Sequence, residues 1–192
     1  MFTDPLQVTT MADILTKEQR HRCMARIRSK DTKPEILLRK ALWRRGFRYK
    51  LNDDKLPGHP DIVLPKYRTV VFVHGCFWHG HKGCKKHVIP ASNAEFWSAK
   101  INNNKNHDQE VWRQLEAKGW SVVVVWECEL AKRKIYETAD KVTSEIKENG
   151  LQFQHYVSGR KTSQKIFHQA EKERRAKETA ALSEIKAMFG KK

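Results

Sequence analysis

The stretch PDIVLPKYRTVVFVHGCFWHGHKGC, residues 60–84, decides the fold of this chain. Its apolar, β-branched runs at 61–64 and 69–74 are separated by the turn-forming residues 65–68, a pattern typical of a β-hairpin. The loop that follows, residues 75–90, is rich in cysteine, histidine and glycine. Because cysteine and histidine are transition-metal ligands, we expect a metal to order this loop directly beyond the hairpin.

The remaining elements complete an α/β pattern. Thr32-Lys33-Pro34-Glu35 combines a threonine cap, an early proline and a glutamate three residues on, so a helix is expected to begin here and to end at Gly46. Further helices are predicted over 17–28 and 94–117. The apolar run 121–125 is predicted to be a central strand that is covered on both faces. This order predicts a mixed sheet flanked by helices.

The charge of the chain indicates a polyanionic partner. The 192 residues include 38 Lys or Arg and 22 Asp or Glu, which gives a net charge of +16. The excess is clustered, since residues 17–50 contain thirteen basic side chains and only three acidic ones. Clustered positive charge is the electrostatic signature of nucleic-acid binding. We therefore expect a nucleic-acid partner and regard a merely solvated basic surface as the weaker interpretation.

The length of the chain fits one domain with an extension. Residues 1–10 are expected to be a disordered leader, 11–145 the folded domain and 146–192 a basic helical extension, for which a frayed, solvated tail is the alternative. No signal peptide opens the chain, and no apolar run reaches the ~18 residues of a membrane span. A cytoplasmic location, where thiols stay reduced, favours metal binding over disulfides for the four cysteines.

Side chains near the hairpin are suited to metal and acid–base chemistry. Asp61 lies beside the second strand, and a carboxylate next to a backbone carbonyl is a hard-ligand pair suited to Mg²⁺. Such an ion stabilises charge on a phosphate during phosphodiester cleavage, although turn capping is the commoner role of a single aspartate. His79, beside an aromatic pair, is interpreted as a proton acceptor. For His59 and His107 we favour surface or structurally hydrogen-bonded roles.

The cysteines indicate a transition-metal site. A structural zinc site with no open position is predicted from Cys76, His81, Cys84 and Cys128. Cys128 is distant in sequence but follows the strand at 121–125, from which it would reach the loop. The alternative is that Cys128 is a buried apolar residue and that the loop binds metal through His79 or His87. Cys23, in the basic helix, is expected to have no special role.

Phe77 and Trp78 stand in a polar loop, where folding alone gives little reason for two large aromatic side chains. Side chains of this kind can wedge between base pairs and unstack them. Trp97 on the long helix is expected to join them, with core packing as its alternative. For the neighbouring Phe96 we predict core packing.

Taken together, these motifs closely resemble the very short patch repair (Vsr) DNA endonucleases. The resemblance covers about residues 11–135, and its central motif, His74 to His81, is highly specific. The matching segments are Asp31-Thr32, Leu56 to Asp61, His74 to His81, Glu95 to Trp97, Lys100-Ile101, Asp108, Gly119-Trp120 and Trp126 to Cys128. Residues after about 140 are not covered.

The resemblance implies a restriction-endonuclease-like (PD-D/ExK) core in residues 11–145, with a mixed sheet flanked by helices and a structural zinc. It implies an enzyme that nicks double-stranded DNA on the 5′ side of the thymine in a T:G mismatch, which arises when 5-methylcytosine deaminates. The expected partners are mismatched duplex DNA and mismatch-repair proteins, with no membrane. The expected form is a monomer in the bacterial cytoplasm, associated with the nucleoid, since a single nick needs one active site.

The resemblance also implies roles for individual residues. Asp61 would hold Mg²⁺ together with the backbone carbonyl of Val73, and a second Mg²⁺ would be reached mainly through waters and phosphate. His79 would be the general base or the group that activates the phosphate. His74, Asp108 and Glu35 would support the attacking water or the metals. The implied zinc ligands are Cys76, His81, Cys84 and Cys128, and the implied DNA-intercalating residues are Phe77, Trp78 and Trp97.

The chain departs from these patterns in places. The restriction-nuclease core expects an acid-x-lysine on the second strand, where this chain has Phe72-Val73-His74, so catalysis would rest on imidazole. The loop before Cys84 holds Lys82-Gly83, where the family pattern has a tighter, histidine-rich loop. Glu35 has a competing role as the capping-box residue. The alternative functions are a restriction-type nuclease on unmodified duplex DNA and a zinc-stabilised DNA-binding module without catalysis.

Overall fold

The described sheet of the protein is mixed, as predicted, and has three strands. The structure, a computed structural model, describes residues 16–26, 28, 30–91 and 93–189. Its strands are β1 (Ile62–Leu64), β2 (Thr69–His74) and β3 (Ser121–Trp126), in the order β1-β2-β3. β1 pairs antiparallel with β2, which confirms the hairpin, and β2 pairs parallel with β3.

The prediction that residues 121–125 form the central strand is wrong, because β2 occupies that place in the described sheet. In the hairpin, β1 pairs with one edge of β2. The chain then crosses over through a long helix, and the returning strand β3 pairs with the other edge, as a parallel connection requires. The prediction that this strand is covered on both faces is correct, since Val122 and Val123 pack in different cores.

Helices surround the sheet. They are α1 (Lys17–Ala25), α2 (Lys33–Arg44), α3 (Ala94–Ala117) and α4 (Ile135–Phe189), with short 3-10 turns η1 (Pro65–Tyr67) and η2 (Glu127–Leu130). α2 begins where predicted, because Thr32 is its N-cap and the Thr32 hydroxyl accepts a hydrogen bond from the N–H of Glu35. After the C-cap residue Arg45, Gly46 has a φ of 87°, a left-handed conformation that glycine adopts readily. α1 ends at Ala25, before the predicted residue 28.

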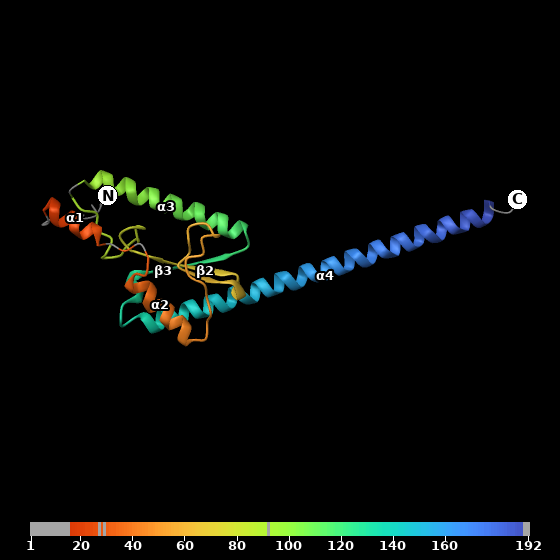
Figure 1. Cartoon of the computed structure of the whole chain (residues 1–192), viewed down its shortest axis with the longest axis horizontal. Helices are drawn as coiled ribbons and strands as arrows, with labels where there is room; N and C mark the ends of the chain where they lie inside the picture. Colours follow the sequence, from red (N-terminus) through yellow and green to blue (C-terminus); the bar gives the residue numbers. More distant parts are fainter. Residues whose placement is uncertain (1–15, 27, 29, 92, 190–192) are drawn as a thin grey trace, which may run out of the picture. The chain divides into compact units, whose positions relative to one another are not determined.

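Side chains alternate along the strands, so the sheet buries a core on each face. On one face, α2 and the beginning of α4 pack against Ile62 and Val71. On the other face, Leu115 of α3 packs against Val70 and Phe72. Figure 1 shows this layering, with the sheet between α3 and the pair formed by α2 and the beginning of α4. Val73 packs on the face covered by α2. Because side chains alternate along the strand, the next residue, His74, lies on the face covered by α3.

The chain divides into two compact units, which are Met1–Asn149 and Gly150–Lys192. α4 begins in the first unit, where Ala139, Val142 and Ile146 are buried. The second unit is helical to Phe189, with side chains described as far as residue 175. The division predicted at residue 145 stays a prediction, and the predicted leader lies outside the described residues. None of the described helices is both long and apolar enough to span a membrane.

Candidate active site and metal centre

A cavity of about 830 Å³ lies beside the C-terminal end of β2. Val73 of β2 and Pro34 at the start of α2 contribute to its wall. The five residues predicted to act in catalysis all line it, and they are Glu35, Asp61, His74, His79 and Asp108. The hairpin, the loop after β2 and two helices therefore bring residues from four separate segments of the sequence to one site.

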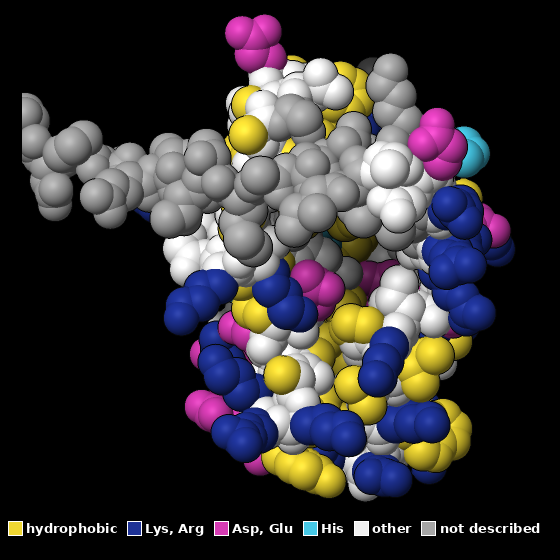
Figure 2. Space-filling view, turned by 90° about the vertical axis from the view of Figure 1, so that its left-hand side faces the viewer, with side chains coloured by type: hydrophobic (Ala, Val, Ile, Leu, Met, Phe, Trp, Pro, Cys, Tyr) yellow, Lys and Arg dark blue, Asp and Glu magenta, His cyan; other side chains and the backbone are white. Residues whose placement is uncertain are grey.

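Basic side chains line part of this cavity, whose wall also carries the predicted catalytic carboxylates. Arg28, Lys30 and Lys33 line it, and a neighbouring hollow of about 470 Å³ is lined by Arg28, Lys33 and Lys40. Figure 2 shows Lys and Arg side chains gathered over one face of the molecule, with fewer acidic ones among them. Basic side chains around a cavity of this size attract the phosphates of a nucleic acid.

Asp61 immediately precedes β1, and the hairpin holds it against the end of β2. Its Oδ2 atom accepts a hydrogen bond of 2.7 Å from the backbone N–H of Val73. Burial raises the pKa of Asp61 to about 6, the hydrogen bond from Val73 opposes this rise, and the Glu35 carboxylate adds to it. A bound cation would favour the ionised form that burial disfavours, so this carboxylate suits a metal ligand.

Glu35 occupies the capping-box position at the N-terminus of α2. Its Oε1 atom accepts a hydrogen bond of 2.7 Å from the Thr32 hydroxyl. Its Oε2 atom accepts hydrogen bonds from the backbone N–H of Asp31 at 3.0 Å and from the Arg39 guanidinium at 2.9 Å. The side chain therefore serves as a helix cap, and the same carboxylate lines the cavity and acts electrostatically on Asp61.

His74, His79 and Asp108 form a compact acid–base cluster. Nδ1 of His79 lies 2.6 Å from Oδ2 of Asp108, and Nδ1 of His74 lies 3.9 Å from the same oxygen. The two imidazole rings stack with their centroids 3.7 Å apart. Because the Asp108 carboxylate binds the Nδ1 proton of His79, the Nε2 atom of the neutral ring is left as a proton acceptor.

The surroundings of His74 keep it neutral. Burial lowers the pKa of His74 to about 4, the neighbouring His79 lowers it further, and Asp108 opposes the shift. Its ring lies 6.0 Å from Trp112 and 5.5 Å from Trp126. Sequence reasoning missed these two indoles as parts of the site, because apolar positions on a helix and at a strand end carry the same pattern as core residues.

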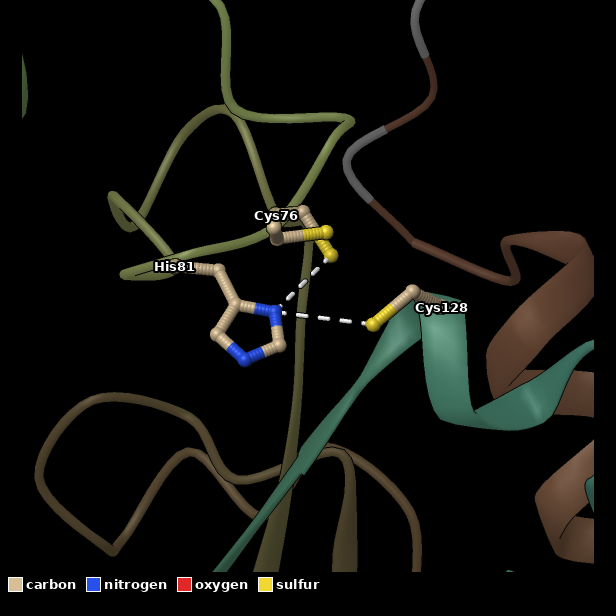
Figure 3. A group of neighbouring side chains, drawn as sticks. Cys76, His81 and Cys128 are labelled. Atoms are coloured by element: carbon tan, nitrogen blue, oxygen red, sulfur yellow. Dashed lines mark hydrogen bonds between the residues drawn. The ribbon is translucent and has the colours of Figure 1, made fainter.

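The four residues predicted to bind zinc come together beyond the ends of β2 and β3. The ligand atoms of Cys76, His81, Cys84 and Cys128 all lie within 4.8 Å of one another. The Sγ atoms of Cys76 and Cys128 lie 3.4 and 3.5 Å from Nδ1 of His81 (Figure 3). The register explains this proximity, since His74 pairs with Trp126 in the parallel strands, and each cysteine follows its strand by two residues.

The donor set suits a thiophilic divalent metal. Burial raises the pKa of Cys76 to about 12 and also raises the pKa of Cys128, so these thiols are protonated unless a cation stabilises the thiolates. The described group includes Cys128, and it includes neither His79 nor His87. Cys23 lies in α1, and its side chain is outside the described residues.

Trp126 touches both clusters. Its ring stacks on His81 of the cysteine group with centroids 4.1 Å apart and an interplanar angle of 6°. The same ring meets His74 edge-on at 5.5 Å. One indole at the end of β3 therefore separates the metal-type group from the acid–base cluster.

The three aromatic side chains predicted to enter DNA form one cluster at the edge of the cavity. The ring centroid of Phe77 lies 5.2 Å from those of Trp78 and Trp97, and the two indoles are 6.0 Å apart. The backbone carbonyl of Trp78, which lines the cavity, accepts a hydrogen bond of 2.8 Å from the side chain of Asn104. This bond ties the loop to α3 and holds the cluster in place.

The prediction that Phe96 packs in the core is wrong. The residue is 60% exposed, and its ring lies 5.2 Å from that of Trp97. The buried positions of α3 begin at Ile101, so the first turn of the helix extends past the core. Phe96 therefore adjoins the aromatic cluster that contains Trp97.

His59 and His107 line the cavity, although both are exposed and neither was assigned to the site. Nδ1 of His59 lies 3.2 Å from Oδ1 of Asp54, in keeping with the hydrogen-bonded role that we favoured. Each histidine lies within two residues of a predicted catalytic carboxylate, and this adjacency is the signal that could have placed them near the cavity.

Known proteins resemble this chain over most of its length. The profile of the family described as DNA mismatch endonuclease Vsr matches residues 12–86. The type II nicking enzyme V.NmeAIP of Neisseria meningitidis is 50% identical over 139 residues, which are 72% of this chain and 99% of the relative. The type II nicking enzyme V.XorIIP of Xanthomonas oryzae is 49% identical over 63% of this chain and 88% of the relative.

The DNA mismatch endonuclease Vsr of Escherichia coli is 41% identical over 124 residues, which are 65% of this chain and 79% of that protein. Identity at this level over most of a relative's length implies the same fold. The family profile also spans Glu35, Asp61 and His79, three of the residues that line the cavity. The chain therefore belongs to the Vsr family of DNA mismatch endonucleases and is a DNA endonuclease.

Proposed function

We propose that this protein is a Mg²⁺-dependent endonuclease that nicks duplex DNA on the 5′ side of the thymine in a T:G mismatch. The observation that carries the proposal is that Asp61 and the His79–Asp108 pair face one cavity, whose wall also carries three basic side chains. A carboxylate suited to a hard cation and a carboxylate-oriented imidazole are the groups that hydrolysis of a phosphodiester needs. The Escherichia coli relative is a DNA mismatch endonuclease, which supports the choice of a mismatch as substrate.

His79 acts as the general base in this proposal. Its Nε2 atom takes a proton from the water whose oxygen attacks phosphorus, while one phosphorus–oxygen bond of the backbone breaks and leaves a nick. Asp108 binds Nδ1 of His79, which sets the tautomer and stabilises the imidazolium that forms. His74 stays neutral beside it, so no second positive charge opposes protonation of His79.

Asp61, together with the backbone carbonyl of Val73, would hold Mg²⁺, and a second ion would be reached mainly through waters and phosphate. Bound Mg²⁺ stabilises negative charge on the phosphate and on the leaving oxygen. Glu35 adds negative charge near Asp61 and so favours a cation there. The helix cap that Glu35 forms also holds the start of α2 against the site.

The cysteine group would hold one structural zinc ion. A set of three thiolates and one imidazole fills a tetrahedral coordination sphere, which leaves no position for substrate. The ion would fix the loop that carries Phe77, Trp78 and His79, because Cys76 and His81 flank these side chains in the sequence. The zinc site therefore acts on catalysis by holding the loop in place.

Phe77, Trp78 and Trp97 would enter the duplex beside the mismatch. Separating stacked base pairs has a free-energy cost of about a few kcal/mol per step, and the cost is lower at a mispaired step. An aromatic wedge next to the cleavage site would therefore favour a mismatch over matched DNA. One chain carries the complete set of groups, so a monomer is sufficient for one nick.

The test is a nicking assay on a labelled duplex that contains one T:G mismatch, with Mg²⁺ present. The wild type is expected to make one cut on the 5′ side of the thymine and to leave a matched T:A duplex intact. Asp61→Ala is expected to bind the mismatched duplex but not to cut it, because it lacks the metal carboxylate. The mismatch should be tested in several flanking sequences.

Other results would replace the proposal. Cutting of matched, unmodified duplex at a rate equal to that of the mismatch would indicate a restriction-type nuclease. Binding without cutting in any sequence context would indicate a zinc-stabilised DNA-binding module. Full activity in the presence of a Mg²⁺-selective chelator would contradict the metal dependence.

A further inference from the structure

The helix of the second unit, Gly150–Lys192, carries no role in the proposed reaction. The match to the family profile, residues 12–86, does not reach it. Among its described side chains, residues 150–175, six are Lys or Arg and two are Glu. This surplus of positive charge on an exposed helix raises the question of what it binds.

The basic side chains are arranged in a stripe. The sequence spacing is four, three, four and three residues between Lys161, Lys165, His168, Lys172 and Arg175. Positions three and four apart share one face of an α-helix, so the five side chains line a single face. All five are exposed, and at 1.5 Å per residue the stripe is about 21 Å long. The stripe presents a continuous line of donors without an apolar residue in it.

Three lysines of this stripe keep their charge available. Arg175 is paired with Glu171 at 2.8 Å. Within the described part of the chain, Lys161, Lys165 and Lys172 make no ion pair, and the neighbouring Glu173 lies on a different side of the helix. Their ammonium groups can therefore bind an external polyanion without breaking an ion pair within the described part of the chain.

A second copy of the chain is a less suitable occupant of this helix. A coiled-coil seam through Phe153, Tyr156 and Phe167 would place Arg160 and Ser163 at the intervening heptad positions. Arg160 in a parallel pair would face the same arginine of the partner, and like charges at a seam are destabilising. Arg160 instead donates a hydrogen bond of 3.2 Å to the Tyr156 hydroxyl. The positive charge of the helix is complementary to DNA, whereas it would repel the same charge on a second copy of the helix.

We propose that Lys161, Lys165 and Lys172 form an additional contact with double-stranded DNA, which binds backbone phosphates and does not read the base sequence. The inference rests on the proposed action of the chain on duplex DNA. Each lysine that neutralises a phosphate releases condensed counterions, so the contact adds affinity that decreases steeply as salt increases. The stripe would hold the enzyme on duplex DNA outside the mismatch itself.

The test uses the full-length protein and a fully matched duplex, so that neither mismatch recognition nor cleavage contributes. The triple variant Lys161→Gln, Lys165→Gln, Lys172→Gln removes the stripe charge and keeps helix propensity. The matched control is Lys118→Gln, Lys132→Gln, Lys141→Gln, which removes three exposed lysines from the first unit, away from the cavity lining. Affinity is measured by fluorescence anisotropy at several salt concentrations, and circular dichroism checks that the helix is retained.

The stripe variant is expected to bind more weakly at low salt, and its plot of log affinity against log salt should be shallower by about 2 to 3 than that of the wild type. The control should retain the wild-type slope. An unchanged slope in the stripe variant, or an equal change in the control, would overturn the inference. So would a dimer, seen by sedimentation without DNA, that the stripe substitutions dissociate.

The nicking assay separates this inference from the proposed function. At low salt and saturating enzyme, the stripe variant should cut the T:G duplex at the wild-type rate, because its active site is intact. If the wild type fails to nick any duplex but the slope changes as expected, the DNA contact stands and the proposed function fails. If the wild type nicks and the slope does not change, the proposed function stands and the stripe contact is overturned.

Discussion

Nδ1 of His79 lies 2.6 Å from Oδ2 of Asp108, a contact between the loop that follows β2 and the middle of α3. The contact joins two segments that are 29 residues apart in the sequence. It fixes the ring orientation and leaves Nε2 directed away from the carboxylate as the basic atom. The chemistry of this site therefore depends on the packing of α3 as much as on the loop.

Asp108→Asn is expected to slow nicking by a factor on the order of 10² to 10⁴, the usual contribution of a positioned general base. The amide keeps the shape of the side chain but loses the negative charge that stabilises the imidazolium. Single-turnover nicking of the T:G duplex measures the effect. Glu110→Gln is the matched control, because it removes an exposed carboxylate from the same helix. Equal rates for Asp108→Asn and the wild type would contradict the role given to the pair.

Asp61→Asn is expected to stabilise the protein at pH 7 without divalent metal, by an amount on the order of 3 kcal/mol. The folded-state pKa of Asp61 is about 6 against an ordinary value of 3.8. The folded state therefore keeps a proton that the unfolded state has lost between these values, and stability falls as the pH rises through this window. Below about pH 4 the two proteins should become equally stable.

Urea unfolding of both proteins across pH 3.5 to about 8 measures this difference. Asp54→Asn, which removes a side chain that is 81% exposed, should show little pH-dependent change and serves as the control. Added Mg²⁺ should stabilise the wild type more than Asp61→Asn. A variant that is less stable than the wild type at every pH would show that the carboxylate is not under electrostatic stress.

Cys76→Ser is expected to reduce the metal content from about one zinc per chain to almost none, and to lower the melting temperature. The buried thiol lies against His81 and cannot be replaced by a hydroxyl as a zinc ligand. Elemental analysis of the purified protein measures the metal. Cys23→Ser removes a thiol from α1 and should keep a full complement of zinc. Folded wild-type protein without any bound metal would contradict the zinc assignment.

Arg39→Met is expected to destabilise the protein by about 3 to 5 kcal/mol, the usual effect of removing one partner from a buried ion pair. The side chains of Arg39 and Glu35 are only 7% and 5% exposed, and the substitution leaves the Glu35 carboxylate buried without its guanidinium. The double variant Glu35→Gln, Arg39→Met should recover part of the loss. Chemical unfolding measures the free energy, and a single variant as stable as the wild type would contradict the prediction.

Trp97→Ala is expected to reduce the preference for T:G over matched duplex about tenfold or more, because one face of the aromatic cluster is lost. Trp43→Ala is the matched control, since Trp43 is a half-exposed tryptophan on α2 that pairs with Tyr49 and Arg48, outside the cluster. Competition binding of the two duplexes measures the preference. An equal effect of the two substitutions would indicate a general loss of stability.

The part of the site that could be predicted from the sequence is the part fixed by local structure. A hairpin with a four-residue connection brings Asp61 to the end of β2, where its side chain reaches the N–H of Val73, and a threonine–glutamate box with Thr32 as N-cap begins a helix. The approach of Cys128 to the loop was also predictable, because a strand returning from a crossover helix pairs with the hairpin. Each of these follows from bonded geometry or from a single pairing.

The remainder depends on contacts between distant segments. The exposure of Phe96 follows from where α3 leaves the core, and the aromatic pattern of the helix does not mark that point. The place of β3 at the edge of the described sheet follows from competition among strands for β2. The contact of Trp112 with His74 depends on the exact rotational orientation of α3 about its axis, and the apolar stripe of the helix predicts this orientation only approximately.

Trp126 stands between His81 and His74, with one face of its ring against the first and its edge toward the second. The cysteine group and the acid–base cluster therefore both pack against the same indole ring. A reagent that removes the metal would displace the Trp126 ring and inhibit cleavage without contacting any catalytic atom. The metal content of a preparation would then set the fraction of active enzyme. A substitution in the cysteine group would also change the packing of the acid–base cluster, and the reverse.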